Sequence, residues 1–185
     1  MAIFYITYSA WILSEIILNI SRRSGKKDKK NQDKGSLRII WITIAIANTV
    51  AILIANNIRF SISHIIIIPY IGLSIIIIGM IFRFYSIWIL GKYFTVDVTI
   101  RENHKLVDLG IYKLVRHPSY LGSIISFIGF GLSLNNWLSL IIIGFSIIFV
   151  MLYRIKIEEN LLISQFGQDY TDYQKRTYRL FPWIY

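Results

Sequence analysis

Long runs of apolar residues, separated by short polar stretches, most strongly limit what this chain can fold into. The three longest runs cover residues 3–20, 37–58 and 62–82. Each approaches or exceeds the roughly 20 residues that a helix needs to cross a hydrocarbon core about 30 Å thick. Two shorter runs, 119–134 and 137–153, flank Asn135-Asn136, a pair typical of a tight turn. We therefore predict an all-α integral membrane protein with about five transmembrane helices, the last two forming a hairpin.

Composition supports this class. Hydrophobic residues make up 55% of the 185-residue chain and charged residues only 16%, too apolar for a soluble domain of this size and for a disordered chain. The chain contains no cysteine, which excludes disulfides, cysteine-ligated zinc and thiol nucleophiles. The first run lacks a small-residue cleavage site, so we interpret it as a retained span and not as a signal peptide. We expect Pro69 and Gly72 to kink the third span.

Positive charge is concentrated on one side of the predicted spans. The net charge is +10, and the stretch 21–34 alone carries seven basic residues. With five alternating spans, the basic loop 21–36, the segment 91–118 and the C-terminal tail share one face. The positive-inside rule makes that face cytoplasmic and leaves the N-terminus outside. Because the basic run lacks interleaved aromatic residues and a recognition motif, we predict no nucleic-acid partner.

Arg116-His117-Pro118 precedes the fourth span, and Pro118 suits the first turn of a helix. Two interpretations are open for the charged pair. Free amides at the helix start, with Arg116 and His117 beside them, can hold a carboxylate or phosphate. Alternatively, both side chains face lipid headgroups at the interface.

Arg154 and Glu158 are four residues apart, so both lie on one face of a helix that continues out of the fifth span. One interpretation is a surface salt bridge. The other is that the guanidinium grips a substrate carboxylate in bidentate fashion while Glu158 orients it. Their position where the helix leaves the bilayer favours a functional role, because unpaired ionisable groups are expensive there.

Other polar residues are weaker candidates. Glu15 and Arg83 are charges within or at the end of spans, where function is the default interpretation, although Arg83 can snorkel. Tyr170 and Tyr173 are expected to pack a short amphipathic helix on the membrane surface. No short ligand pairing supports a metal site, so we predict none. No glycine-rich motif follows a strand, which argues against a Rossmann nucleotide site.

Taken in order, short motifs between residues 83 and 182 resemble the catalytic region of the isoprenylcysteine carboxyl methyltransferase family. This family belongs to a wider group of membrane methyltransferases that includes the phospholipid N-methyltransferases. The motifs are Arg83 with Leu90-Gly91, His104 to Val107, Gly110 to Tyr112, Arg116 to Gly122, Glu158-Glu159, Phe166 to Tyr173 and Arg179 to Pro182, with the apolar hairpin between them. The Ile-rich composition and the few spans before this region suggest a short microbial homologue.

The resemblance implies S-adenosyl-L-methionine as methyl donor, converted to S-adenosyl-L-homocysteine in a cytoplasmic pocket, and a lipid-like acceptor entering from the bilayer. It divides the chain into a three-span N-terminal region, 1–90, and a catalytic region, 91–185. It places Arg154 and Glu158 at the acceptor carboxylate as catalytic residues. The implied cofactor contacts are His104, Lys105, Leu106, Val107, Tyr112, His117, Pro118, Ser119 and Tyr120. No site is assigned in 94–103.

The leading hypothesis is thus methylation of a prenylcysteine carboxylate or another amphiphilic acid. Three alternatives stay open. They are methylation of a phospholipid amine, reduction by a nicotinamide cofactor, and a non-enzymatic membrane adaptor whose basic loop binds anionic lipid. The oligomeric state is not predicted.

Overall fold

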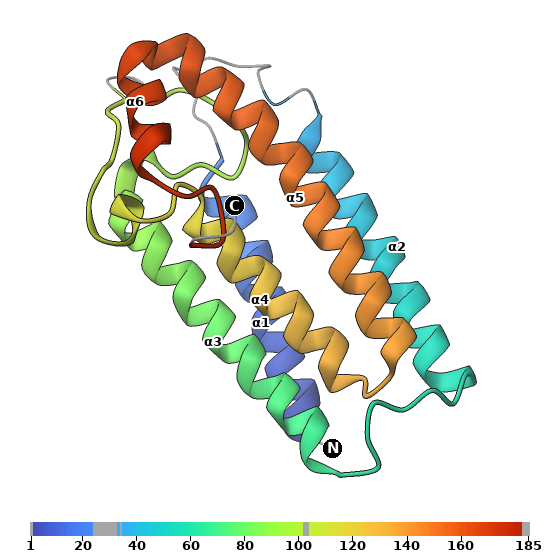
Figure 1. Cartoon of the computed structure of the whole chain (residues 1–185). Coiled ribbons are helices and arrows are strands. Elements are labelled where there is room, and N and C mark those ends of the chain that lie inside the picture. Colours follow the sequence, from blue (N-terminus) through green and yellow to red (C-terminus); the bar gives the residue numbers. More distant parts are fainter. Residues whose placement is uncertain (1, 24–32, 34, 102–103, 183–185) are drawn as a thin grey trace.

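The computed structural model describes residues 2–23, 33, 35–101 and 104–182. Within this part of the chain the regular structure is helical, and the all-α prediction is confirmed (Figure 1). The helices are α1 (Ala2–Ser21), α2 (Ser36–Asn57), α3 (Ile67–Leu90), α4 (Pro118–Ser133), α5 (Trp137–Phe166) and α6 (Gln168–Arg176), with short 3-10 turns at η1 (Gly91–Tyr93) and η2 (Gly110–Lys113). Most of the basic loop 21–36, including Lys26, Lys27, Lys29, Lys30 and Lys34, lies outside the described residues.

Four helices, α1, α2, α3 and α5, are long and apolar enough to cross a membrane. The fourth predicted span, which corresponds to α4, has 16 residues and rises only about 24 Å. In contrast, α5 has 30 residues and rises about 45 Å, so it extends well past the other helices at one end of the bundle (Figure 1). This is the end at which the connector, residues 91–117, joins α3 to α4; we call it the connector end.

The predicted third span, 62–82, begins too early. Residues 62–66 lie outside the helix, and α3 runs from Ile67 to Leu90. Pro69 stands in the first turn, where its missing N–H costs no helical hydrogen bond, so a mid-span kink at this residue is not needed. Gly72 has a different role, because a Cβ there would lie 2.5 Å from the backbone nitrogen of Ser133.

Close packing of small residues joins α3 to α4. A Cβ on Gly79 would lie 2.6 Å from the backbone nitrogen of Ser126, and one on Gly129 would lie 2.7 Å from that of Ile76. A Cβ on Gly122 would likewise lie 2.7 Å from the backbone nitrogen of Arg83. Membrane helices associate through such contacts, because lipid tails remove the hydrophobic driving force between helices. These glycines therefore bring the backbones of α3 and α4 together along most of the length of α4.

The hairpin turn between α4 and α5 is confirmed. Asn135 adopts a left-handed conformation with φ 50°, and the Asn136 side chain accepts a hydrogen bond from the backbone N–H of Ser139 at the start of α5. Asn135 also bonds the backbone of Ser63, at 2.8 and 3.2 Å. The turn is thereby tied to the chain between α2 and α3.

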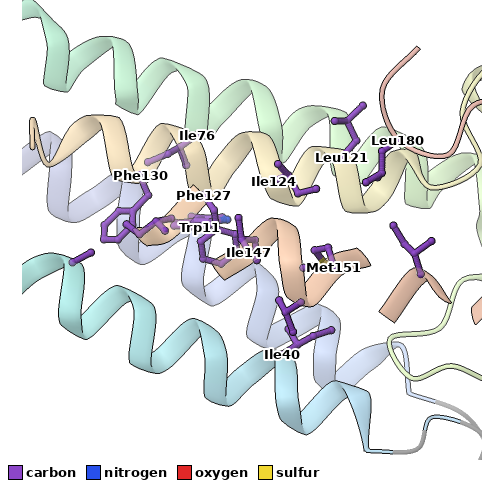
Figure 2. Close-up of a cluster of buried hydrophobic side chains, with 14 of the residues drawn as sticks. Trp11, Ile40, Ile76, Leu121, Ile124, Phe127, Phe130, Ile147, Met151 and Leu180 are labelled. Carbon is purple, nitrogen blue, oxygen red and sulfur yellow. The ribbon is translucent and has the colours of Figure 1, made fainter. Parts of the chain in front are cut away.

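The helices pack as two groups that meet at this turn. In Figure 1, α4 lies along α3 with α1 behind them, and α5 lies along α2. A buried cluster fills the space between the groups, as Figure 2 shows for Trp11, Phe127, Phe130 and Ile147. Trp11 packs edge-on against Phe127, with ring centroids 4.7 Å apart. Aromatic and branched side chains thus hold α1, α4 and α5 together in the membrane.

Candidate functional site

The C-terminal segment folds back onto the connector and holds the start of α4. The backbone N–H of Arg116 donates to the carbonyl of Tyr178 at 2.8 Å, and that of His117 donates to the carbonyl of Arg179 at 3.2 Å. Val115 and Tyr178 form a short parallel bridge. Pro118 follows as the first residue of α4, as predicted from its position.

A cavity of about 830 Å³ lies between the connector, the start of α4 and the extended end of α5. We call it the connector cavity. It is lined by Leu90, Tyr93, Phe94, Thr95, Asp97, Val98, Thr99, His104, Lys105, Leu106, Val107, Tyr112, Arg116, His117, Ser119, Tyr120, Arg154, Glu158, Leu161, Leu162, Phe166, Tyr170 and Tyr173.

Nearly all of the residues that the family resemblance places at the cofactor or the acceptor line this cavity. They are His104, Lys105, Leu106, Val107, Tyr112, His117, Ser119, Tyr120, Arg154 and Glu158. Pro118 is the exception, because it is fully buried and serves to begin α4. The proximity of these residues is observed, whereas their roles toward a ligand remain predictions.

Arg154 lies at the centre of a hydrogen-bond network, and only 2% of it is exposed. Its guanidinium donates to Asp33 Oδ1 at 2.7 Å, to Ser36 Oγ at 2.6 Å and to the carbonyl of Val96. Its Nε donates to the Tyr120 hydroxyl at 3.0 Å. The surface salt bridge considered for Arg154 and Glu158 is therefore wrong, because the guanidinium is buried and is bound to Asp33.

Tyr120 connects the two predicted catalytic residues. Its hydroxyl accepts from Arg154 Nε and donates to Glu158 Oε2 at 2.7 Å. The side chain of Glu158 is 30% exposed, and Oε2 lies 3.7 Å from His117 Nδ1. Glu158 thus presents a partly accessible carboxylate to the connector cavity.

Glu159, which was not among the predicted site residues, organises the start of α4. Its carboxylate accepts from Arg116 Nε at 3.0 Å and contacts His117 Nε2 at 3.3 Å and Arg179 at 2.8 Å. Arg116 also bonds the carbonyls of Gln174 and Thr177. The headgroup-facing interpretation of Arg116 and His117 is therefore wrong, because both side chains are buried against protein.

The surface role predicted for Tyr170 and Tyr173 is also wrong, because α6 packs against the connector and buries both rings. The Tyr173 hydroxyl donates to the carbonyl of Tyr112 at 2.6 Å. Burial, together with the negative charge of Glu159, raises the pKa of Tyr170. The Phe-Gly-x-x-Tyr-x-x-Tyr motif identified this segment as part of the family resemblance. Its spacing did not show that the tyrosines face the connector.

Three aromatic rings form one wall of the connector cavity. Tyr93 and His104 stack with centroids 5.0 Å apart, and Phe166 meets His104 edge-on at 5.6 Å. They come from η1, the connector and the end of α5. Such a wall suits a flat heteroaromatic ligand.

A second cavity, also of about 830 Å³, lies within the helix bundle. We call it the membrane cavity. Its lining comes mostly from apolar residues of α1, α2, α4 and α5: Trp11, Ile12, Glu15, Leu18, Asn19, Leu37, Ile40, Trp41, Ile44, Asn48, Arg83, Phe94, Thr95, Val96, Tyr120, Ser123, Phe127, Met151 and Arg154. Ile12 and Trp41 also belong to the outer surface, so the cavity reaches the lipid-facing side of the bundle.

Glu15 and Arg83 form an ion pair in the wall of the membrane cavity, with a closest N–O distance of 2.6 Å. Arg83 also donates to the carbonyl and hydroxyl oxygens of Ser119, at 3.1 and 3.0 Å. The snorkelling considered for Arg83 is thus wrong, since its side chain turns inward. The pair ties α1 and α3 to the first turn of α4.

The two cavities share a partition. Phe94, Thr95, Tyr120 and Arg154 belong to the lining of both. The fold and these cavities define a multi-pass helical membrane protein with a polar site at one end of the bundle and an apolar site within it.

Comparison with known proteins gives the family. The model of the isoprenylcysteine carboxyl methyltransferase (ICMT) family matches residues 70–164, more than half of the chain. The chain therefore belongs to this family.

Named relatives agree with this assignment. Protein-S-isoprenylcysteine O-methyltransferase B of Arabidopsis thaliana is 37% identical over 115 residues, which are 61% of this chain and 58% of the relative. The Dictyostelium discoideum and Tribolium castaneum enzymes are 34% and 37% identical over 118 residues, covering 63% and 62% of this chain but 50% and 41% of the relatives. This chain thus spans about half of the length of these proteins.

A solved structure also matches. The eukaryotic intramembrane Ras methyltransferase ICMT superposes with a TM-score of 0.63 at 30% identity, covering 78% of this chain and 52% of that one.

Proposed function

We propose that this protein is a carboxyl methyltransferase that uses S-adenosyl-L-methionine to methylate a prenylcysteine or another amphiphilic acid. The observation that carries the proposal is the partition between the two cavities. Tyr120 and Arg154 line both the polar connector cavity and the apolar membrane cavity. A polar donor and a lipid-like acceptor can therefore meet at one buried guanidinium.

The residues of the connector cavity fit the donor. The rings of Tyr93, His104 and Phe166 suit an adenine base, and the Glu158 carboxylate suits a positively charged group. Leu161 and Leu162 add apolar surface for the nucleoside. When bound, S-adenosyl-L-methionine supplies a methyl group on a cationic sulfur, which needs alignment more than it needs a strong base or a metal.

The residues of the membrane cavity fit the acceptor. Apolar side chains of α1, α2 and α4 would hold its chain, and Arg154 at the partition would orient its carboxylate. Arg154 already holds one carboxylate, that of Asp33 at 2.7 Å, so this position accommodates such a group. The Tyr120 hydroxyl bonds both the Arg154 guanidinium and the Glu158 carboxylate and so fixes their relative position. We thus assign Arg154 to acceptor orientation and Glu158 to the donor side.

The two cavities are formed largely by different parts of the chain. Residues 91–185 supply most of the connector cavity, whereas α1 and α2, within residues 1–90, supply much of the membrane cavity. Because the basic residues gather at the connector end, we propose that this end is cytoplasmic and that the N-terminus is outside.

Methylation of a phospholipid amine is the second candidate, but the geometry favours an acid. An uncharged amine has no use for the buried guanidinium at the partition, and a cationic ammonium would be repelled by it.

The test is transfer of a labelled methyl group by the detergent-purified protein to a prenylcysteine analogue or to phosphatidylethanolamine. We expect the prenylcysteine analogue to become labelled, and we expect base to release this label, as it does from a methyl ester. Base-stable label on phosphatidylethanolamine, with none on the acid, would overturn it. Replacing exposed Lys156 by Ala serves as the control, because this side chain lines neither cavity.

A further inference from the structure

The lining of the membrane cavity follows one face of α4 from the partition down to Phe127. The residues of α4 in this lining are Tyr120, Ser123 and Phe127, and their spacing of three and seven residues puts them on the same face of the helix. Tyr120 belongs to the partition. Seven residues of helix rise about 10 Å, so Phe127 lies about that far from the partition, towards the end of the cavity away from the connector.

A smaller cavity of about 180 Å³ lies beyond Phe127, between α2, α4 and α5. We call it the deep cavity. Its position is clearest on α5, where Arg154 and Met151 line the membrane cavity and Ile147 and Ile143 line the deep cavity. Ile147 precedes Met151 by four residues, about 6 Å of helix, so the deep cavity lies farther from the connector end.

Phe127 separates the two cavities, because it belongs to the lining of both, together with Ile44 and Asn48. Its ring is held in place, since the residue is only 8% exposed and Trp11 packs edge-on against it with centroids 4.7 Å apart. Figure 2 shows Phe127 beside Trp11 and Ile147. A close-packed interior accommodates an added methylene poorly. A chain that extends from the partition into the bundle therefore meets a fixed stop at Phe127.

We propose that Phe127 is a specificity-determining residue that limits the length of the apolar chain of the acceptor. The deep cavity is the space that a longer chain would enter if this ring were removed. The inference rests on the proposed function, since it takes the apolar chain of the methyl acceptor to occupy the membrane cavity. A competing route leads out through the lipid-facing wall at Ile12 and Trp41, and a chain that bends out there does not reach Phe127. The two routes predict different responses to chain length.

The experiment measures kcat/KM for the geranyl, farnesyl and geranylgeranyl cysteine analogues, which differ only in chain length. For the wild type we expect kcat/KM to fall at the geranylgeranyl analogue, because its chain is too long for the stop. In Phe127→Ala we expect the ratio of kcat/KM for the geranylgeranyl analogue to that for the geranyl analogue to rise about 10-fold, since even one methylene changes kcat/KM by this order in an apolar pocket.

Phe130→Ala is the matched control. Phe130 lies one turn away on α4, is buried to a similar degree and also packs against Trp11, but it lines neither cavity. The two variants therefore lose the same side-chain atoms from the same buried cluster. Phe130→Ala should keep the wild-type ratio. If either alanine variant does not fold in detergent, Phe127→Leu and Phe130→Leu are compared in the same way, with a smaller shift expected.

An unchanged ratio in Phe127→Ala would overturn the inference, because it would mean that the chain leaves through the lipid-facing wall. The same shift in both variants would also overturn it, because the effect would then belong to the core and not to the stop. Ligand binding is read separately, as the rise in the thermal unfolding midpoint on adding each analogue. If no analogue is methylated, the proposed function fails. A midpoint rise that shifts towards the longer chain in Phe127→Ala alone would still support the stop, and no such shift would overturn it as well.

Discussion

The connector cavity and the membrane cavity enclose similar volumes but are built from different parts of the chain. The first is lined mostly by polar and aromatic residues between Leu90 and Tyr173, the stretch that carries recognisable motifs. The second takes much of its wall from α1 and α2, which carry no motif. Among the residues that the structure describes, Phe94, Thr95, Tyr120 and Arg154 belong to both.

This difference reflects what each kind of ligand requires of its binding site. A polar ligand needs particular side chains at particular positions, so its site leaves a pattern of spaced motifs. An apolar ligand needs only sufficient volume and an apolar lining, which many combinations of Ile, Leu and Trp provide. Substitutions in the two cavities should therefore change different measured quantities.

The largest expected effect comes from the partition. Arg154→Leu removes the group shared by both cavities and leaves Asp33 without its cation, so we expect methyl transfer to fall about 100-fold or more. Initial rates at saturating donor and acceptor measure this change. Residual activity within a few-fold of the wild type would show that the cavities meet elsewhere. Lys156→Ala, two residues away and exposed, should change the rate by less than about twofold.

A second substitution tests the scaffold beneath both cavities. Gly79→Val places side-chain atoms where a Cβ alone would lie 2.6 Å from the Ser126 backbone nitrogen, so α3 and α4 must separate. We expect a loss of stability of about 1–3 kcal/mol, seen as a lower thermal unfolding midpoint in detergent. Gly144→Ala in α5 is the control, because nothing in the described part of the chain lies within 4 Å of its added methyl group. Equal midpoints for the two variants would contradict the close contact.

A matched pair of variants separates the cavities. Tyr93→Ala removes the ring that stacks on His104, and we expect donor affinity to fall about 10-fold while the KM for the acceptor is unchanged. Trp41→Ala, in the wall of the membrane cavity, should raise the acceptor KM and leave donor affinity intact. Calorimetric titration and steady-state kinetics measure the two quantities. If both variants changed both quantities equally, the assignment of separate sites would fail.

The smallest expected effect concerns pH. Burial alone would raise the pKa of Asp33, but N–H donation from Leu37 and Val98 and the charge of Arg154 outweigh it and lower the pKa. A lowered pKa in the folded state stabilises the protein above the unfolded value of about 3.9, and this stabilisation is lost as the pH falls through the folded value. Asp33→Asn should therefore cost about 1 kcal/mol at pH 7 and progressively less below about pH 4. A constant difference across that range would count against the charge effect.

The sequence predicted the helical class and the hairpin well, because long apolar runs and an Asn-Asn turn have few alternative structures. It predicted less well where contacts depend on tertiary packing. The burial of Tyr170, the role of Glu159 and the pairing of Arg154 with Asp33 join residues far apart in the chain, and no spacing rule reports them. The early start expected for α3 arose because residues 62–66 are as apolar as the helix that follows.

The central claim is that donor and acceptor occupy separate cavities that meet at Tyr120 and Arg154. The most direct test is calorimetric binding of S-adenosylhomocysteine to the wild type, to Tyr93→Ala and to Trp41→Ala, each shown to be folded in detergent. We predict that the wild type and Trp41→Ala bind with similar affinity and that Tyr93→Ala binds about 10-fold more weakly. No binding by the folded wild type, or equal weakening in both variants, would contradict the account.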